Sequence, residues 1–348
     1  MSNKYNIKVL DCTLRDGGRV FDCNFSDKII KKIIKNLFLA NIDIIEIGFL
    51  RNKNIKVHNK NNTFFNTIEE AEKMIPNGCL TEYALFIDHG LYNVDELLKV
   101  NTKTKIRNLR YAFTKNDYNK EFFKIEENIK LLIEKGYNLF LQPINILSYS
   151  KKDLFNLIRL ANKYRVKSFA IVDTYGSLYD EDLNKILSYL NKKLKKRINL
   201  VFHSHNSYQL SFALAQSFIN NSINRNIVID ATLSGIGKCA GNLPIELICT
   251  YLNKKYNMTY NLDEIYNLND EIILKYKDKY DWGYNQYTLI QGEYQVHPNN
   301  IIYLQSKKVN LIQTKNILSK LDDYSKSRYF YNTLNELIKG ERNSDSDK

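Results

Sequence analysis

Cysteine and long apolar runs are scarce in this chain. The cysteines are five, an odd number, and none of them forms a Cys-x-x-Cys pair: Cys12, Cys23, Cys79, Cys239 and Cys249. This usage argues for reduced thiols in a cytoplasm and against a disulfide framework. No apolar segment approaches the roughly 18 residues of a transmembrane helix, and residues 1–8 lack the apolar stretch of a signal peptide. We therefore expect a cytoplasmic protein with no membrane partner.

Two signatures of other functional classes are also missing. No Gly-x-Gly-x-x-Gly follows the first apolar run, which disfavours a doubly wound dinucleotide-binding sheet. The net charge is +13, a value that by itself suggests a nucleic-acid partner. The lysines, however, are scattered through amphipathic segments and interleaved with Asp and Glu. We interpret most of this charge as solvated helix faces and expect no nucleic-acid partner.

Short apolar runs alternate with longer amphipathic segments, and this alternation repeats eight times. The predicted strands are 7–12, 42–49, 81–87, 106–113, 137–143, 168–173, 199–205 and 226–231. The predicted helices are 26–40, 67–75, 93–99, 118–135, 151–164, 180–195, 208–221 and 243–254. Eight such units match an α/β fold of the (β/α)8 type, so we predict a TIM barrel over residues 1–254.

The alternation ends after residue 254. Residues 263–277 and 311–340 have helical patterns, and a Tyr-rich connection over 282–287 lies between them. We expect a mainly helical extension over 255–340 that packs near the barrel mouth and could hold two chains together as a homodimer. Residues 341–348 are polar and charged, as in a disordered tail.

Two of the five histidines lie two residues apart in a predicted strand. Alternation along a strand sends His203 and His205 to the same side, which makes half of a metal site. The alternative is one core histidine and one histidine at the surface. In a barrel, the first and seventh strands flank the eighth, so Asp16, at the end of the first, could join both imidazoles on one divalent ion. Asn242 could add an amide oxygen.

Four sequence motifs along the chain resemble those of the DRE-TIM metallolyase superfamily. They are Asp11-x-Thr13-Leu14-Arg15-Asp16-Gly17, Glu46-x-Gly48-Phe49, His203-x-His205-Asn206 and Gly235-x-Gly237-x-x-x-Gly241-Asn242. That superfamily includes 4-hydroxy-2-oxovalerate aldolase, hydroxymethylglutaryl-CoA lyase, and the isopropylmalate and homocitrate synthases. The resemblance covers residues 7–254 and follows the order of the motifs on a barrel pattern.

The resemblance implies a bound Mg²⁺ or Mn²⁺, with Zn²⁺, Co²⁺ or Fe²⁺ as further candidates. Its ligands would be Asp16, His203 and His205, joined by Asn242 in some branches. It also implies a catalytic Arg15 beside the metal, where a guanidinium can stabilise an enolate oxygen. Glu46 is expected to orient Arg15.

The chain departs from the family pattern at Arg19, where the aldolases carry a catalytic His and the synthases a Gln. A guanidinium is a poor general base, so we expect Arg19 to bind an anionic part of the substrate. The proton would then be moved by Tyr284, by His297 or by a water on the metal. Cys239 is a further acid/base candidate or a small packing residue.

Two residues near the ends of predicted strands, Arg110 and Gln142, could hold a substrate carboxylate or hydroxyl. The alternative for both is hydrogen bonding inside the barrel.

The leading hypothesis is a metal-dependent aldolase or lyase that acts on a 2-oxo acid or on an anionic, sugar-like substrate. The first alternative is a Claisen-type synthase that condenses an acyl-CoA with a 2-oxo acid. A two-His-one-carboxylate iron oxygenase would use the same ligand set. The non-enzymatic alternative is a basic nucleic-acid-binding or scaffold protein on a barrel fold.

Overall fold

Eight parallel strands close into a barrel in the computed structural model, which describes residues 6–52, 63–222 and 224–346. The closure comes from β1, which pairs with β2 on one side and β9 on the other. The barrel strands are β1 (Ile7–Asp11), β2 (Ile44–Leu50), β4 (Glu82–Asp88), β5 (Asn108–Phe113), β6 (Asn138–Pro143), β7 (Ser168–Asp173), β8 (Asn199–Ser204) and β9 (Ile227–Ala231). A two-residue strand, β3 (Phe64–Phe65), pairs with β2 outside the closed ring. The predicted TIM barrel and its eight strands are confirmed.

Alternation along the strands separates an apolar outer layer from a mixed interior. In β9, Ile227 and Ile229 pack in the layer between barrel and helices, whereas Val228 faces the small apolar cluster inside the barrel. Because side chains alternate between the two faces of a strand, Asp230 of β9 and Arg110 of β5 also point into the barrel, and both are buried. The barrel therefore carries charges in its interior.

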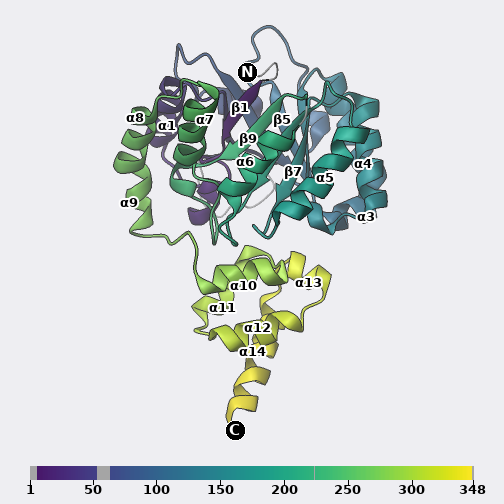
Figure 1. The fold of residues 1–348 in the computed structure, drawn as a ribbon, viewed down its shortest axis with the longest axis vertical. Helices are drawn as coiled ribbons and strands as arrows, with labels where there is room; N and C mark the ends of the chain where they lie inside the picture. Colours follow the sequence, from purple (N-terminus) through teal and green to yellow (C-terminus); the bar gives the residue numbers. More distant parts are fainter. Residues whose placement is uncertain (1–5, 53–62, 223, 347–348) are drawn as a thin grey trace.

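Helices surround the barrel on the outside (Figure 1). They are α1 (Asp27–Leu39), α2 (Ile68–Glu72), α3 (Lys115–Glu134), α4 (Lys151–Tyr164), α5 (Asp180–Lys193), α6 (Ser211–Asn221) and α7 (Ile245–Tyr256). Capping boxes begin α3 at Thr114 and α4 at Ser150. The helix predicted over 93–99 is wrong: only a 3-10 turn, Val94–Glu96, forms there. Leu98 is 67% exposed, so a second turn would bury little apolar surface.

Three short segments after α7 pack with the barrel and not with the rest of the extension. They are α8 (Leu262–Leu268), a π-helical turn (Asn269–Ile273) and α9 (Leu274–Lys277). The side chains of Ile265, Leu268 and Ile273 belong to the main barrel core. Figure 1 shows α8 and α9 beside α1 and α7.

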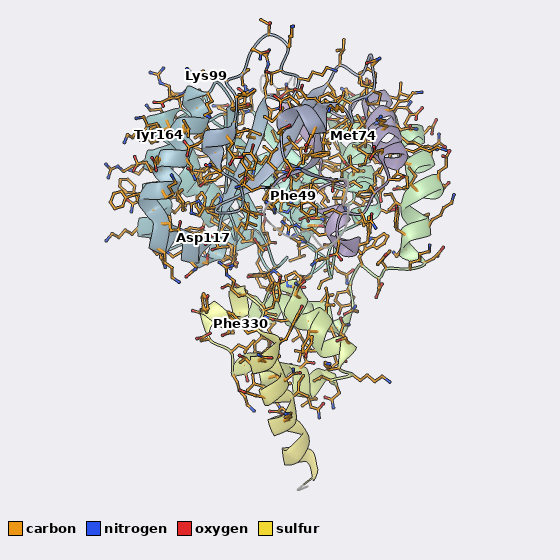
Figure 2. The ribbon with its side chains drawn as sticks, turned by 180° about the vertical axis from the view of Figure 1, so that it is seen from behind. Phe49, Met74, Lys99, Asp117, Tyr164 and Phe330 are labelled. Carbon is orange, nitrogen blue, oxygen red and sulfur yellow. The ribbon has the colours of Figure 1, made fainter. Side chains whose placement is uncertain are left out.

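The remaining helices form a second cluster at the carboxyl ends of the strands (Figure 1). They are α10 (Gln286–Tyr294), α11 (Pro298–Ser306), α12 (Leu311–Ser319), α13 (Asp323–Ser327) and α14 (Tyr331–Ser346). Their core includes Ile301, Leu304, Ile317 and Leu334. Figure 2 shows Asp117 on the barrel rim that faces this cluster and Lys99 at the opposite end of the barrel.

The cluster differs from the predicted extension in three details. The sequence pattern did not indicate α10 or α11, and the helix expected over 311–340 is interrupted twice. The tail expected to be disordered over 341–348 is helical as far as Ser346, while 347–348 lie outside the described residues. The homodimer remains a prediction. No helix in the described ranges is both long enough and apolar enough to cross a membrane.

Gly176 generates a stability prediction, because its backbone lies against the segment that carries His205. Its φ is +59°, and an added Cβ would lie 2.4 Å from Ser207 N and 2.7 Å from His205 C. Backbone strain and the clash together should make Gly176→Ala lower the free energy of unfolding by about 3 kcal/mol. Urea denaturation measures this change.

The matched control is Gly90→Ala. Gly90 also has a positive φ, +77°, but nothing lies within 4 Å of the added Cβ. Only the backbone strain applies there, so the loss should be about 1 kcal/mol. Equal losses in the two variants would contradict the packing argument.

Candidate active site

A cavity of about 960 Å³ lies between the carboxyl ends of the barrel strands and the helical cluster. The barrel contributes Arg15, Asp16 and His203 to its wall, and the cluster contributes His297 and Arg328. Catalytic residues of TIM barrels lie at this face, which the loops after the strands build. We therefore place the candidate active site here.

The side chains of Asp16, His203 and His205 meet at the base of this cavity. One ligand atom from each lies within 4.8 Å of the others, so the three could hold a metal ion. Asp16 follows β1, and a turn fixes it there by directing the N–H groups of Arg15 and Asp16 to the carbonyl oxygen of Cys12. The alternation of β8 brings the two histidines to one side.

Both imidazoles are oriented by hydrogen bonds on their far nitrogens. His203 Nδ1 donates to Asp230 Oδ2 at 3.0 Å, and His205 Nδ1 donates to the carbonyl oxygen of Gly241 at 3.0 Å. Each ring therefore has its Nε2 lone pair available as a ligand, the arrangement typical of metal-binding histidines. His205 Nε2 lies 3.5 Å from Asp16 Oδ2. The donor set fits a divalent cation.

The electrostatic surroundings keep Asp16 and His205 unprotonated. Burial alone would raise the pKa of Asp16, but the Arg15 guanidinium, followed by His205 and His203, holds that pKa well below its usual range. Burial lowers the pKa of His205 to about 4, against the opposing effect of Asp16. At neutral pH a cation would thus meet a carboxylate and an unprotonated His205.

Asn242 reaches Asp16 with its amide nitrogen. Nδ2 donates to Asp16 Oδ2 and to the carbonyl oxygen of Ile236, both at 2.9 Å. Two acceptors thus fix the orientation of the amide, and a nitrogen that donates cannot bind a cation. In this arrangement the Asn242 nitrogen positions Asp16, while its buried Oδ1 has no hydrogen-bond partner among the described residues. The metal-ligand role expected for that oxygen stays a prediction.

Arg15 lies between Glu46 and the metal cluster. Its Nε donates to Glu46 Oε2 at 2.7 Å and its Nη1 to Asp16 Oδ1 at 2.6 Å. The guanidinium also stacks on Phe86, with 4.4 Å between Cζ and the ring centroid. Its Nη2 makes no hydrogen bond to any described residue and remains available to a ligand in the cavity.

Arg110 and Gln142 lie at different depths. Arg110 is fully buried beneath the cavity, where it donates to Glu46 at 3.0 Å and to Asp230. It therefore has the internal role that was the alternative to substrate binding. Gln142 does line the cavity, and with its oxygen turned inward it accepts from Arg110 Nε at 3.1 Å. That orientation leaves the Gln142 amide nitrogen for a substrate.

Arg19 points into the cavity mouth. Its side chain is 37% exposed, and its guanidinium stacks on Phe49 at 4.8 Å. It lies 3.5 Å from Asp16 and 3.9 Å from Asp88, longer than the contacts that these carboxylates make with Arg15 and Arg51.

The three acid/base candidates are placed unequally. His297 lines the cavity, and its pKa is lowered to about 3 by burial and by Lys238, Arg19 and Arg328. Tyr284 is 49% exposed and is not part of the cavity wall. Cys239 packs against the helical cluster, and burial raises its pKa to about 12. Neither His297 nor Cys239 is a base that titrates near neutral pH.

Sequence reasoning missed three residues of this site. Asp230 orients His203, and an acidic residue inside the apolar run of β9 was a signal for it. Lys238 and Arg328 line the cavity from the glycine loop and from the helical cluster. No local pattern distinguishes these two from the many surface lysines and arginines.

Known proteins that resemble this chain are enzymes of carbon-carbon bond chemistry by name. A 4-hydroxy-2-oxovalerate aldolase from Thermomicrobium roseum is 24% identical over 253 residues, covering 71% of this chain and 67% of its own length. A 2-isopropylmalate synthase from Staphylococcus saprophyticus is 25% identical over 251 residues, covering 69% and 47%. The chain thus spans about half the length of that synthase.

Solved structures support the fold. The N-terminal domain of a protein from Bacteroides vulgatus superimposes with a TM-score of 0.74 at 22% identity, covering 88% of this chain and 98% of that one. The HMG-CoA lyase of Bacillus subtilis gives a TM-score of 0.59 at 16% identity, covering 79% and 95%. A family model described as HMGL-like matches residues 6–272. Because that model spans more than half of the sequence, the chain belongs to the HMGL-like family, the DRE-TIM enzymes that its four motifs resemble.

Proposed function

We propose that the protein is a divalent-metal-dependent aldolase or lyase that makes or breaks a carbon-carbon bond next to the carbonyl of a 2-oxo acid. The observation that carries this proposal is the convergence of Asp16, His203 and His205 beside the Arg15 guanidinium, whose Nη2 bonds to none of the described residues. Relatives named aldolase and synthase support the same chemistry.

A cation held by these three residues, Mg²⁺ or Mn²⁺ for preference, would polarise the carbonyl of the 2-oxo acid as a Lewis acid. Arg15 Nη2 would donate to the oxygen on which enolate charge develops. Glu46 and Phe86 fix the plane of that guanidinium before substrate binds, so no reorganisation is needed. Gln142 could hold a substrate hydroxyl or carboxylate from the opposite wall.

The low pKa of His297 changes the role that we assign to it. A histidine with a pKa of about 3 stays neutral at physiological pH and is a weak base. Its Nδ1 accepts from the N–H of Asn299 at 3.1 Å, so the ring proton is on Nε2. We infer that His297 donates a hydrogen bond to substrate.

The condensing synthase is the second candidate, and the match to a 2-isopropylmalate synthase favours it. An aldolase releases pyruvate from a 4-hydroxy-2-oxo acid, whereas a synthase releases free CoA from an acyl-CoA. Assays of both products with Mg²⁺ or Mn²⁺ would separate the aldolase from the synthase.

Turnover that requires oxygen would instead favour the two-His-one-carboxylate oxygenase. Membership in an enzyme family argues against a nucleic-acid-binding or scaffold protein.

The first prediction from the proposed function concerns the metal. A double variant, His203→Ala with His205→Ala, removes two of the three ligands and should abolish Mn²⁺ retention while the fold persists, because both imidazoles lie at the barrel mouth. Metal content after dialysis and a circular-dichroism melt measure the two effects. His89→Gln is the control: His89 lines the same cavity, but Tyr111 and Glu121 occupy its nitrogens. Unchanged metal content in the double variant would remove the site assignment.

The second prediction concerns Arg15. Lysine preserves the charge beside Asp16 but cannot contact Glu46, Asp16 and substrate at once. Arg15→Lys should therefore lower kcat by about 100-fold and leave Mn²⁺ affinity within about threefold. Steady-state kinetics and metal titration give the two numbers. Arg107→Lys, at an exposed arginine near the start of β5, should change neither. Full kcat in Arg15→Lys would show that Arg15 does not stabilise the transition state.

A further inference from the structure

Arg19 carries a charge that the protein itself neutralises poorly. Its two nearest carboxylates, Asp16 and Asp88, are each held more closely by another arginine, Arg15 and Arg51 respectively. Arg19 Nε makes no hydrogen bond within the described part of the chain, and its nearest carboxylate oxygen, Asp16 Oδ1, lies 3.5 Å away. The side chain lines the cavity and is 37% exposed, so its guanidinium can bind an anion there.

Lys238 adds a second positive charge to the same cavity wall. It belongs to the glycine loop between β9 and α7, and its Nζ donates to the neutral amide oxygen of Asn299 at 2.8 Å. No carboxylate of the described residues forms an ion pair with Lys238. Arg19 and Lys238 line the same cavity. Burial, followed by the Arg19 charge, lowers the pKa of Lys238, and Asp22 opposes this shift.

His297 faces these cations from the helical cluster. Arg19, Lys238 and His297 all line the same cavity. Lys238 and His297 also both bond to Asn299, at 2.8 Å and 3.1 Å. The residue precedes α11 as its N-cap, and its Nε2–H makes no hydrogen bond to a described residue. A guanidinium, an ammonium and a neutral N–H donor thus converge from three segments of the chain.

We propose that Arg19, Lys238 and His297 form an oxyanion-binding subsite for a second anionic group of the substrate, a phosphate or a carboxylate. The statement that this anionic group belongs to a substrate rests on the proposed function. Donors from three directions match three oxygens, which favours a tetrahedral phosphoryl group over a planar carboxylate. Because Arg19 lies 3.5 Å from Asp16, the subsite adjoins the metal cluster, and the substrate must be short as well as doubly anionic.

The first experiment titrates inorganic phosphate into the full-length protein without added metal, by calorimetry. Phosphate should bind the wild type, and Lys238→Met should weaken the affinity at least tenfold. Lys115→Met is the matched control, because Lys115 lines the same cavity but already pairs with Asp153 at 2.6 Å. That variant should stay within twofold of the wild type. Arg19→Gln repeats the test at a second position, in case Lys238→Met does not fold.

A second titration, with oxalate as a mimic of the enolate, tests the proposed function separately. Oxalate binding that requires Mn²⁺ and persists in Lys238→Met supports the metal site. If oxalate does not bind in the presence of Mn²⁺, only the metal site is overturned, because the phosphate titration contains no added metal. Acetate in place of phosphate distinguishes a carboxylate subsite from a phosphoryl one. Phosphate affinity that is unchanged in both Lys238→Met and Arg19→Gln, or reduced equally in Lys115→Met, would overturn the subsite.

Discussion

A continuous network of buried charges across the barrel mouth is the constraint on which the site depends. It passes by direct contacts through Asp16, Arg15, Glu46, Arg110, Asp230 and His203. Removing one partner from a buried ion pair costs about 3 to 5 kcal/mol, because the other charge stays behind uncompensated. The five charged members thus hold one another in place and tie β1, β2, β5 and β9 together at the level of the cavity floor. His203 joins β8 to them by one hydrogen bond.

The same network sets the electrostatic character of the floor. Two arginines face three carboxylates within it, which leaves one net negative charge among these five groups. Glu46 Oε1 and Asp230 Oδ1 have no hydrogen-bond partner in the described residues, so the negative charge is not fully satisfied by the protein. A divalent cation beside Asp16 would reverse the sign of that charge and suits the floor better than an anion does.

The sequence predicts the barrel well, because strand alternation and helix periodicity are local signals. All eight barrel strands lie where the pattern indicates, and the spacing of His203 and His205 is enough to expect both rings on one side. The pairing of Arg110 with Asp230 was not predictable in this way, since the two residues are 120 positions apart and meet only when the barrel closes. For Asn242, only the coordinates show whether its oxygen or its nitrogen faces Asp16.

The helical cluster was the hardest part to predict, and it lies beyond residues 6–272, which the family model matches. Amphipathic segments indicate helices but not which surface they dock on, so the position of His297 over the mouth required the structure. Arg19 lines this cavity together with Arg15 and Lys238, and all three charges would attract an anionic group of a substrate. The glycine loop and α11 meet at that point, where Lys238 bonds Asn299. We infer that the barrel fixes the reacting end of the substrate, while this junction selects its other end.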